Sequence, residues 1–199
     1  MRRALRMACR TRGARAAVVS LLVLCLTIPA IPASASGTGI ASSTEDQLQR
    51  FALSLVNCVR AGGWVRTSGS CDRHPAARYR SSHRKPLQLS TRITNRVSRP
   101  YAIRMARAGY LSHDLGSGFS ERFSRAGISR PFGEAIGVGS YGSARADIIS
   151  SFRRMQEEKI TGAWSRWHWR YIRESDFHRV GIGIARRHGS TYIAYDFAH

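Results

Sequence analysis

Residues 180–197, with the sequence VGIGIARRHGSTYIAYDF, decide the fold prediction. Their first part, Val180–Ala185, alternates aliphatic residues with glycine, and their last part, Thr191–Phe197, is rich in β-branched and aromatic residues. Gly189, between the two parts, favours a turn. This stretch therefore predicts a β-hairpin.

Upstream of the hairpin, apolar residues recur every three or four positions, which is typical of helices with one buried face. The expected helices are Thr44–Arg60, Leu89–Ala108 and Ala144–Glu158, with a shorter helical turn at Ser120–Ala126. Pro100 should kink or interrupt the second of them. Phe132–Gly139 is predicted to be a strand. Helices interleaved with a few antiparallel strands predict an α+β fold, a layered sandwich.

Two segments are predicted to be irregular, a basic loop at 64–84 and an aromatic run at 164–172. The aromatic side chains either form a wall on which a ligand stacks, or divide between the core and the rim of a cleft. They are Trp164, Trp167, Trp169 and Tyr171.

The first 35 residues have the features of a secretory signal peptide. Six arginines without any acidic residue precede an almost wholly apolar stretch, Ala16–Leu26. Ala33-Ser34-Ala35 is a small-residue cleavage pattern, so we expect cleavage before Ser36 and a secreted, extracellular protein. A retained single-span anchor is the alternative, although Ala16–Ile31 is short for a bilayer.

The remaining chain divides into a leader and one domain. Residues 36–46 are small and polar and should form a flexible leader, and residues 47–199 are long enough for one domain with a hydrophobic core. No window of about 18 uninterrupted apolar residues occurs, which excludes a multi-span membrane protein. We expect no transmembrane segment in the mature chain.

The chain is strongly basic, with 32 basic and 12 acidic side chains and a net charge of +20. Loss of the six signal-peptide arginines leaves 26 basic against 12 acidic side chains, or +14. This charge is either a generally solvated arginine surface or an attraction to anionic material, such as cell-wall polymers or lipid headgroups. No helix-turn-helix, zinc-finger or single-strand-binding motif supports a specific nucleic-acid partner.

Two cysteines, Cys58 and Cys71, remain after the signal peptide is removed. In an oxidising compartment such a pair is expected to form a disulfide, and two free thiols are the alternative. The closed loop would be short and would stabilise the fold by about 3 kcal/mol.

Three separated residues, His113, Glu134 and His168, are candidates for chemistry. Imidazole and carboxylate groups are natural ligands of divalent metals when they converge, and they also form acid–base sets. Their spacing matches no short zinc motif, so they could equally be structural or surface residues.

Five segments, in order along the chain, resemble motifs of the CAP superfamily, also called SCP-like extracellular domains (cysteine-rich secretory, antigen 5 and pathogenesis-related proteins). The resemblance extends over about Leu48–Phe197. The matching segments are Asn57–Arg60, Leu87–Leu89, Met105–His113, Gly133–Gly137, and the spacing from His168 to Phe177, Val180, Gly181 and Gly183.

The resemblance implies a three-layer α-β-α sandwich with a small antiparallel sheet and a large central cleft. In that family two histidines and two glutamates face the cleft and can hold a divalent cation, often zinc. His113, Glu134 and His168 match three of these positions. The fourth would be Glu158, with Glu157 or no fourth ligand as alternatives.

The resemblance suggests a secreted binding domain whose cleft can hold a metal and which binds lipid, cell-wall or other anionic extracellular material. The alternative is a zinc-dependent hydrolase or peptidase, in which His113 and His168 hold zinc and Glu134 is the catalytic base. A basic antimicrobial effector is a third hypothesis.

Overall fold

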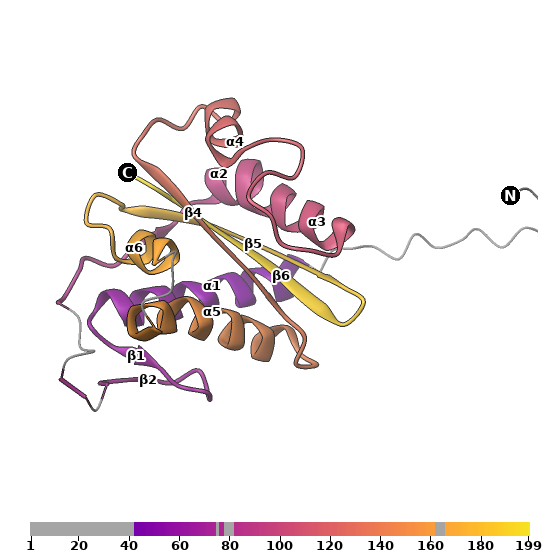
Figure 1. The fold of residues 1–199 in the computed structure, drawn as a ribbon. Coiled ribbons are helices and arrows are strands. Elements are labelled where there is room, and N and C mark those ends of the chain that lie inside the picture. Colours follow the sequence, from indigo (N-terminus) through magenta and orange to yellow (C-terminus); the bar gives the residue numbers. More distant parts are fainter. Residues whose placement is uncertain (1–41, 75, 78–81, 162–165) are drawn as a thin grey trace, which may run out of the picture. The chain divides into compact units, whose positions relative to one another are not determined.

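The computed structural model describes residues 42–74, 76–77, 82–161 and 166–199 (Figure 1). The predicted signal peptide at 1–35, the predicted leader up to residue 41, and Trp164 lie outside the described residues. Within the described ranges, no helix has both the length and the apolar character needed to cross a membrane.

A four-stranded sheet with the strand order β3-β5-β6-β4 forms the middle of the domain. The strands are β3 (Gln88–Leu89), β4 (Phe132–Gly139), β5 (Arg179–Arg187) and β6 (Ser190–Ala198). β4, β6 and β5 pair antiparallel, and the short edge strand β3 pairs parallel to β5. β5 and β6 form the hairpin that the sequence predicts.

Helices cover both faces of this sheet, which confirms the predicted α+β three-layer sandwich (Figure 1). One layer consists of α1 (Ser42–Arg60), α5 (Ala144–Thr161) and α6 (Trp167–Arg173). The other consists of α2 (Thr91–Ile93), the π-helical turn η2 (Thr94–Ser98), α3 (Arg99–Ala108) and α4 (Phe119–Arg125). Successive side chains of β6 point toward opposite helical layers. Tyr195 and Phe197 pack in the α1–α5 core, whereas Tyr192 and Ala194 pack against α3.

Two glycines of β5 allow the α2–α3 layer to lie directly on the sheet. A Cβ atom at Gly183 would lie 2.0 Å from the backbone oxygen of Ser98, and one at Gly181 would lie 2.4 Å from Ile93 Cγ2. The Ile182 backbone N–H donates a hydrogen bond to Thr94 Oγ1 (3.1 Å), which ties the strand to the helix above it. The glycine alternation in the sequence therefore serves this close approach.

The irregularity expected at Pro100 is the π-helical turn η2, which ends two residues before it. A proline ring clashes with the carbonyl group four residues earlier, and Arg96, in η2, is that residue. A wider turn relieves the clash, so the helical segment continues into α3.

The structure corrects three predicted boundaries. The run at 164–172, which was predicted to be irregular, contains α6. Packing stabilises this helix, since Ile172 is buried and Tyr171 packs against Gly133 of β4. The second helix was predicted from Leu89, but Leu89 lies in β3 and the helix begins after Ser90, whose Oγ accepts the Ile93 N–H. Residues 42–46 of the predicted flexible leader belong to α1.

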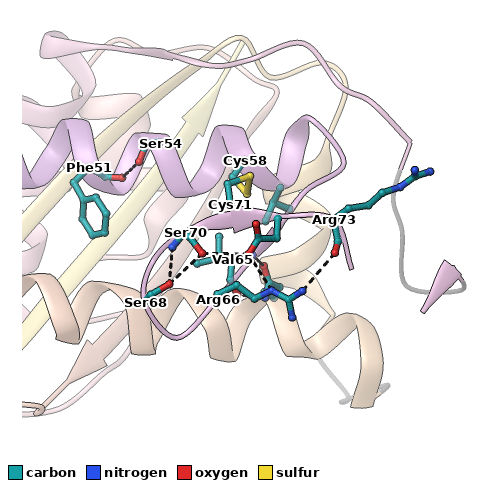
Figure 2. The surroundings of a disulfide bond; sticks show 12 residues. Phe51, Ser54, Cys58, Val65, Arg66, Ser68, Ser70, Cys71 and Arg73 are labelled. Carbon is teal, nitrogen blue, oxygen red and sulfur yellow. Dashed lines mark hydrogen bonds and ion pairs between the residues drawn. A yellow bond between two sulfur atoms is a disulfide. The ribbon is translucent and has the colours of Figure 1, made fainter. Parts of the chain in front are cut away.

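A small hairpin of β1 (Trp64–Val65) and β2 (Cys71–Asp72) lies within the basic loop predicted to be irregular. Cys58 of α1 forms the predicted disulfide with Cys71 of β2, which fastens the hairpin to the helix (Figure 2). The amide of Gln156 in α5 bonds both backbone groups of Val65, at 2.8 and 3.1 Å. These contacts attach the hairpin to the α1–α5 layer.

The end of α1 is fixed by a fully buried arginine. The Arg60 guanidinium donates to four backbone carbonyl groups, those of Lys85, Ile172, Glu174 and Phe177, at 2.7 to 3.2 Å. Burial lowers its pKa to about 10, so it remains charged at neutral pH. Asn57, one turn earlier, exchanges two hydrogen bonds with the backbone of Leu87. The Asn57–Arg60 motif thus joins α1 to the segments that precede β3 and β5.

We predict that Gly183→Ala lowers the free energy of unfolding by about 3 kcal/mol, because the methyl group would overlap the Ser98 backbone and displace η2 from the sheet. Gly118→Ala is the matched control, since its Cβ would meet only the side chain of Asp114, at 3.2 Å. Urea denaturation measures both. Equal stability of the two variants would contradict the close-approach argument.

Candidate functional site

A cleft of about 400 Å³ lies beside the edge strand β4. It is lined from both layers by polar side chains of the predicted set and by aromatic side chains: His113, Asp114, Phe119, Glu134, Trp167, His168 and Tyr171. Because β4 is the last strand of the sheet, residues from the two helical layers can meet past its edge.

The loop that follows α3 positions His113. Gly109 ends α3 in the left-handed conformation, with φ +81°. The Tyr101 hydroxyl, on α3, donates to the Ser112 carbonyl oxygen (2.5 Å) and accepts the Leu115 N–H (3.2 Å). These bonds hold the loop against α3 and fix the backbone on both sides of His113.

Glu134 is almost fully buried, and both its carboxylate oxygens have partners. Oε1 accepts a hydrogen bond from His113 Nδ1 at 2.7 Å, and Oε2 forms an ion pair with Arg122 of α4. The buried Arg122 guanidinium also donates to the carbonyl oxygens of His113 (2.9 Å) and Ser117 (2.5 Å), and it lies 3.3 Å from the centre of the Tyr101 ring. Arg122, which the sequence analysis missed, therefore fixes Glu134 in the cleft wall.

A second histidine–glutamate pair comes from the other layer. His168 Nδ1 of α6 lies 2.5 Å from Glu158 Oε1 of α5, and the other oxygen of Glu158 accepts the Trp169 N–H at 3.3 Å. Glu157, the alternative fourth residue, instead forms an ion pair with Arg153 at 3.1 Å. Of the two glutamates, Glu158 is therefore the one beside the cleft histidine.

The two pairs face each other, with the ring centres of His113 and His168 5.9 Å apart and their planes inclined by 26°. A carboxylate accepts but does not donate hydrogen bonds, so each Nδ1 must donate, and Nε2 is the nitrogen that a neutral ring offers to a metal. Two imidazoles on one tetrahedral zinc ion, each at its usual Zn–N distance, have ring centres about 5.2 Å apart. The observed rings would have to approach each other by several tenths of an ångström to share such an ion.

The described residues do not form a group of three or more histidine, cysteine, aspartate or glutamate side chains placed to hold a metal ion. The groups that could hold a metal ion here are the two imidazoles, and Glu134 and Glu158 contact their Nδ1 atoms.

The aromatic run contributes unequally to the cleft. Trp167 lines it with half of its surface exposed, and Tyr171 lines it while packing on Gly133. Trp169 packs against the main core instead. The run is thus divided between core and cleft rim, as one of the two hypotheses for it expected.

Asp196 is a further buried acid that the sequence analysis missed. It pairs across the strands with Glu134 and is fully buried on the same face of the sheet. Neither carboxylate oxygen makes a hydrogen bond of ordinary geometry among the described residues, although Ser98 lies nearby. Burial, together with the negative charge of Glu134, raises the pKa of Asp196 well above its usual value. A signal for Asp196 was present in the sequence. Side chains of a strand alternate between its two faces, so a strand at Thr191–Phe197 places Asp196 on the same buried face as Tyr192 and Ala194.

The chain is thus a three-layer α-β-α domain in which histidine–glutamate pairs and aromatic side chains line a cleft beside the edge strand. The chain has the fold of the SCP domain. It is similar to the solved structure of an extracellular SCP-domain protein from Bacillus anthracis str. Ames, with a TM-score of 0.54 and 15% identity. The match covers 82% of this chain and 45% of that one, so the chain spans less than half the length of that protein.

Two other solved structures are similar at lower TM-scores. The CAP domain of Enterococcal PrgA has a TM-score of 0.49 and 14% identity, with 80% of this chain and 64% of that chain covered. The crystal structure of NaASP2 with Zn²⁺ has a TM-score of 0.48 and 14% identity, with 80% of each chain covered. No family model matches the chain, and no curated protein matches its sequence.

We predict that Asp196→Asn changes how stability depends on pH. The raised pKa favours the protonated carboxyl in the folded state, whereas the unfolded chain loses this proton near pH 4. This contribution to wild-type stability is therefore complete below about pH 4 and falls by up to about 1.4 kcal/mol per pH unit as the pH rises toward the folded-state pKa. The variant lacks this loss and should gain stability relative to wild type from about pH 4.5 to pH 7.5.

Urea denaturation of wild type and Asp196→Asn across that pH range measures the difference in the free energy of unfolding. A difference that stays constant with pH would mean that Asp196 has the same pKa in both states, contrary to this prediction.

Proposed function

We propose that the chain is a secreted binding domain whose cleft takes up a divalent cation on His113 and His168 and whose basic surface binds anionic wall or membrane material. The observation on which the cleft proposal rests is the opposed arrangement of two imidazoles, 5.9 Å apart, each with a glutamate on its Nδ1. Imidazole nitrogens suit zinc, and a carboxylate behind each ring strengthens the nitrogen as a ligand.

Binding is favoured over hydrolysis because of the state of Glu134. A general base needs an oxygen within reach of the water that it activates. Both oxygens of Glu134 are already occupied, one by His113 and the other by the buried guanidinium of Arg122. A bound cation would instead supply a Lewis acid to which an oxygen or nitrogen atom of a ligand in the cleft could coordinate.

Secretion is supported by the arginine-rich, then apolar N-terminus with its small-residue cleavage pattern. The extracellular location stated for the similar Bacillus anthracis protein agrees with it. A disulfide between Cys58 and Cys71 is also stable in an oxidising compartment.

Binding to anionic material is supported by the charge that remains on the mature chain, 26 basic against 12 acidic side chains. Many of the basic residues are exposed arginines outside the cleft, for example Arg50 in α1 and Arg186 in β5. Such a surface attracts polyanions over distances set by the ionic strength.

We predict that the purified mature protein binds about one zinc ion per chain, and that His113→Ala and His168→Ala each abolish binding. Glu158→Gln should weaken the affinity about 10- to 100-fold, because it loosens the His168 ring without removing a ligand. Isothermal titration calorimetry and metal analysis measure both effects. The control is His188→Ala, in the exposed β5–β6 turn, and it should bind as wild type does. Equal zinc content in all variants would refute a cleft metal site.

We also predict that the mature protein sediments with phosphatidylglycerol-containing vesicles and with cell-wall preparations but not with phosphatidylcholine vesicles. Retention should fall steeply when sodium chloride is raised from about 0.05 to 0.5 M, because screening shortens the range of exposed charges. Co-sedimentation at each salt concentration measures the effect. Retention that does not change with salt would argue against electrostatic binding.

A further inference from the structure

A second cavity, of about 240 Å³, lies away from the cleft and shares none of its lining residues. It is found where α2, the loop after α4, the start of β5 and the end of β6 meet, close to the C-terminus marked in Figure 1. Its polar side chains are those of three arginines, two serines and a histidine: Arg92, Arg130, Arg179, Ser90, Ser129 and His199.

The three arginines carry positive charge that the described part of the chain does not neutralise. None of Arg92, Arg130 and Arg179 lies within ion-pair distance of an acidic group among the described residues, and no aspartate or glutamate lines the cavity. Arginines elsewhere in the same layer, such as Arg99 and Arg125, do have carboxylate partners. Three unpaired guanidinium groups around one cavity repel one another unless an anion joins them.

Arg92 is held in position before any ligand arrives. Its Nη2 donates to the carbonyl oxygens of Ala126 (2.9 Å) and Gly127 (3.1 Å) at the C-terminal end of α4. Gly127 has φ +65°, and a Cβ atom there would lie 2.8 Å from the Arg92 Nη2. The glycine thus makes room for the guanidinium, whose remaining N–H groups are available to a ligand.

The other two arginines are attached to ordered parts of the fold. Arg130 lies over the ring of Phe132, with 5.2 Å between the guanidinium carbon and the ring centre. The backbone of Arg179 pairs with Gln88 of β3 and with Ala198 of β6, so its Cα position is fixed from both sides. All three arginine side chains are exposed to solvent, so an anion can reach their guanidinium groups.

We propose that this cavity, the arginine pocket, binds a phosphate group. Planar guanidinium groups bind phosphate oxygens in a bidentate manner, and three of them match a tetrahedral anion with up to two negative charges better than a carboxylate with one. The hydroxyl groups of Ser90 and Ser129 can donate to the remaining oxygens. This inference rests on the proposed binding of anionic material. It deepens that proposal because it names the chemical group that is bound, a phosphate, and the place on the protein where it binds.

The test compares two double variants with the same change in charge. Arg130→Gln/Arg179→Gln removes two guanidinium groups from the arginine pocket and leaves Arg92, which also holds the end of α4. Arg96→Gln/Arg107→Gln removes two exposed arginines that line neither cavity and form no ion pair among the described residues. Circular dichroism checks that both variants are folded.

The probe is inorganic phosphate, titrated into each protein at constant ionic strength with chloride as the balancing anion. We expect saturable binding to wild type, at least tenfold weaker binding to Arg130→Gln/Arg179→Gln, and binding within twofold of wild type for Arg96→Gln/Arg107→Gln. The tenfold loss follows from the removal of two charge-assisted hydrogen-bonding groups. No binding to wild type, or equal weakening of both double variants, would overturn the proposal.

Vesicles containing phosphatidic acid distinguish a lipid headgroup from free phosphate as the source. If the pocket variant also loses vesicle binding, and inorganic phosphate displaces wild type from the vesicles, the ligand is a headgroup; if only phosphate binding is lost, it is the free anion. Wild type that ignores anionic vesicles and wall material would refute the proposed function. Wild type that binds them, with a pocket variant that still binds phosphate normally, would refute the arginine pocket alone.

Discussion

One buried guanidinium, that of Arg122, holds the cleft together. It joins α4 to Glu134 of β4, to the carbonyl groups of the loop that contains His113, and to the ring of Tyr101 on α3. Without it, the buried carboxylate of Glu134 would lie beside Asp196 of the neighbouring strand with no guanidinium partner. A buried ion pair adds little net stability, but removal of one partner leaves an uncompensated charge, so Arg122 constrains the position of Glu134 and, through it, the ring of His113.

Arg60 has a comparable position in the other layer, where it bonds only backbone carbonyl groups. These carbonyls belong to segments far apart in sequence, near Lys85 and between Ile172 and Phe177. Those segments connect α1 and α6 to the starting ends of β3 and β5, so their placement sets where α6 and hence His168 lie. Each cleft histidine thus belongs to a segment whose backbone is bonded by a buried arginine, His113 by Arg122 and α6 by Arg60.

The sequence predicts best the elements whose patterns are long. The hairpin of β5 and β6 and helices α1, α3 and α5 have enough turns or alternations for their period to be recognised. The strands β1, β2 and β3 are too short to show a period, and α6 is a helix because of what it packs against rather than because of its own pattern. In the cleft, imidazoles and glutamates were identifiable by the resemblance of their surroundings to a family. Arg122 and Asp196 were missed because arginine is common in this chain and because a single acid in a strand has no motif around it.

The distribution of charge separates the two proposed binding sites physically. In the cleft the carboxylates of Asp114, Glu134 and Glu158 lie beside two imidazoles and a single guanidinium, that of Arg122, and the affinity for a cation depends chiefly on coordination by nitrogen. The arginine pocket has the opposite character, because its guanidinium groups have no acidic partner among the described residues. Added salt should therefore weaken anion binding at the pocket while leaving coordination by the two histidines nearly unchanged. A chelator should have the reverse effect, so the two activities can be switched off independently in one and the same preparation of the protein.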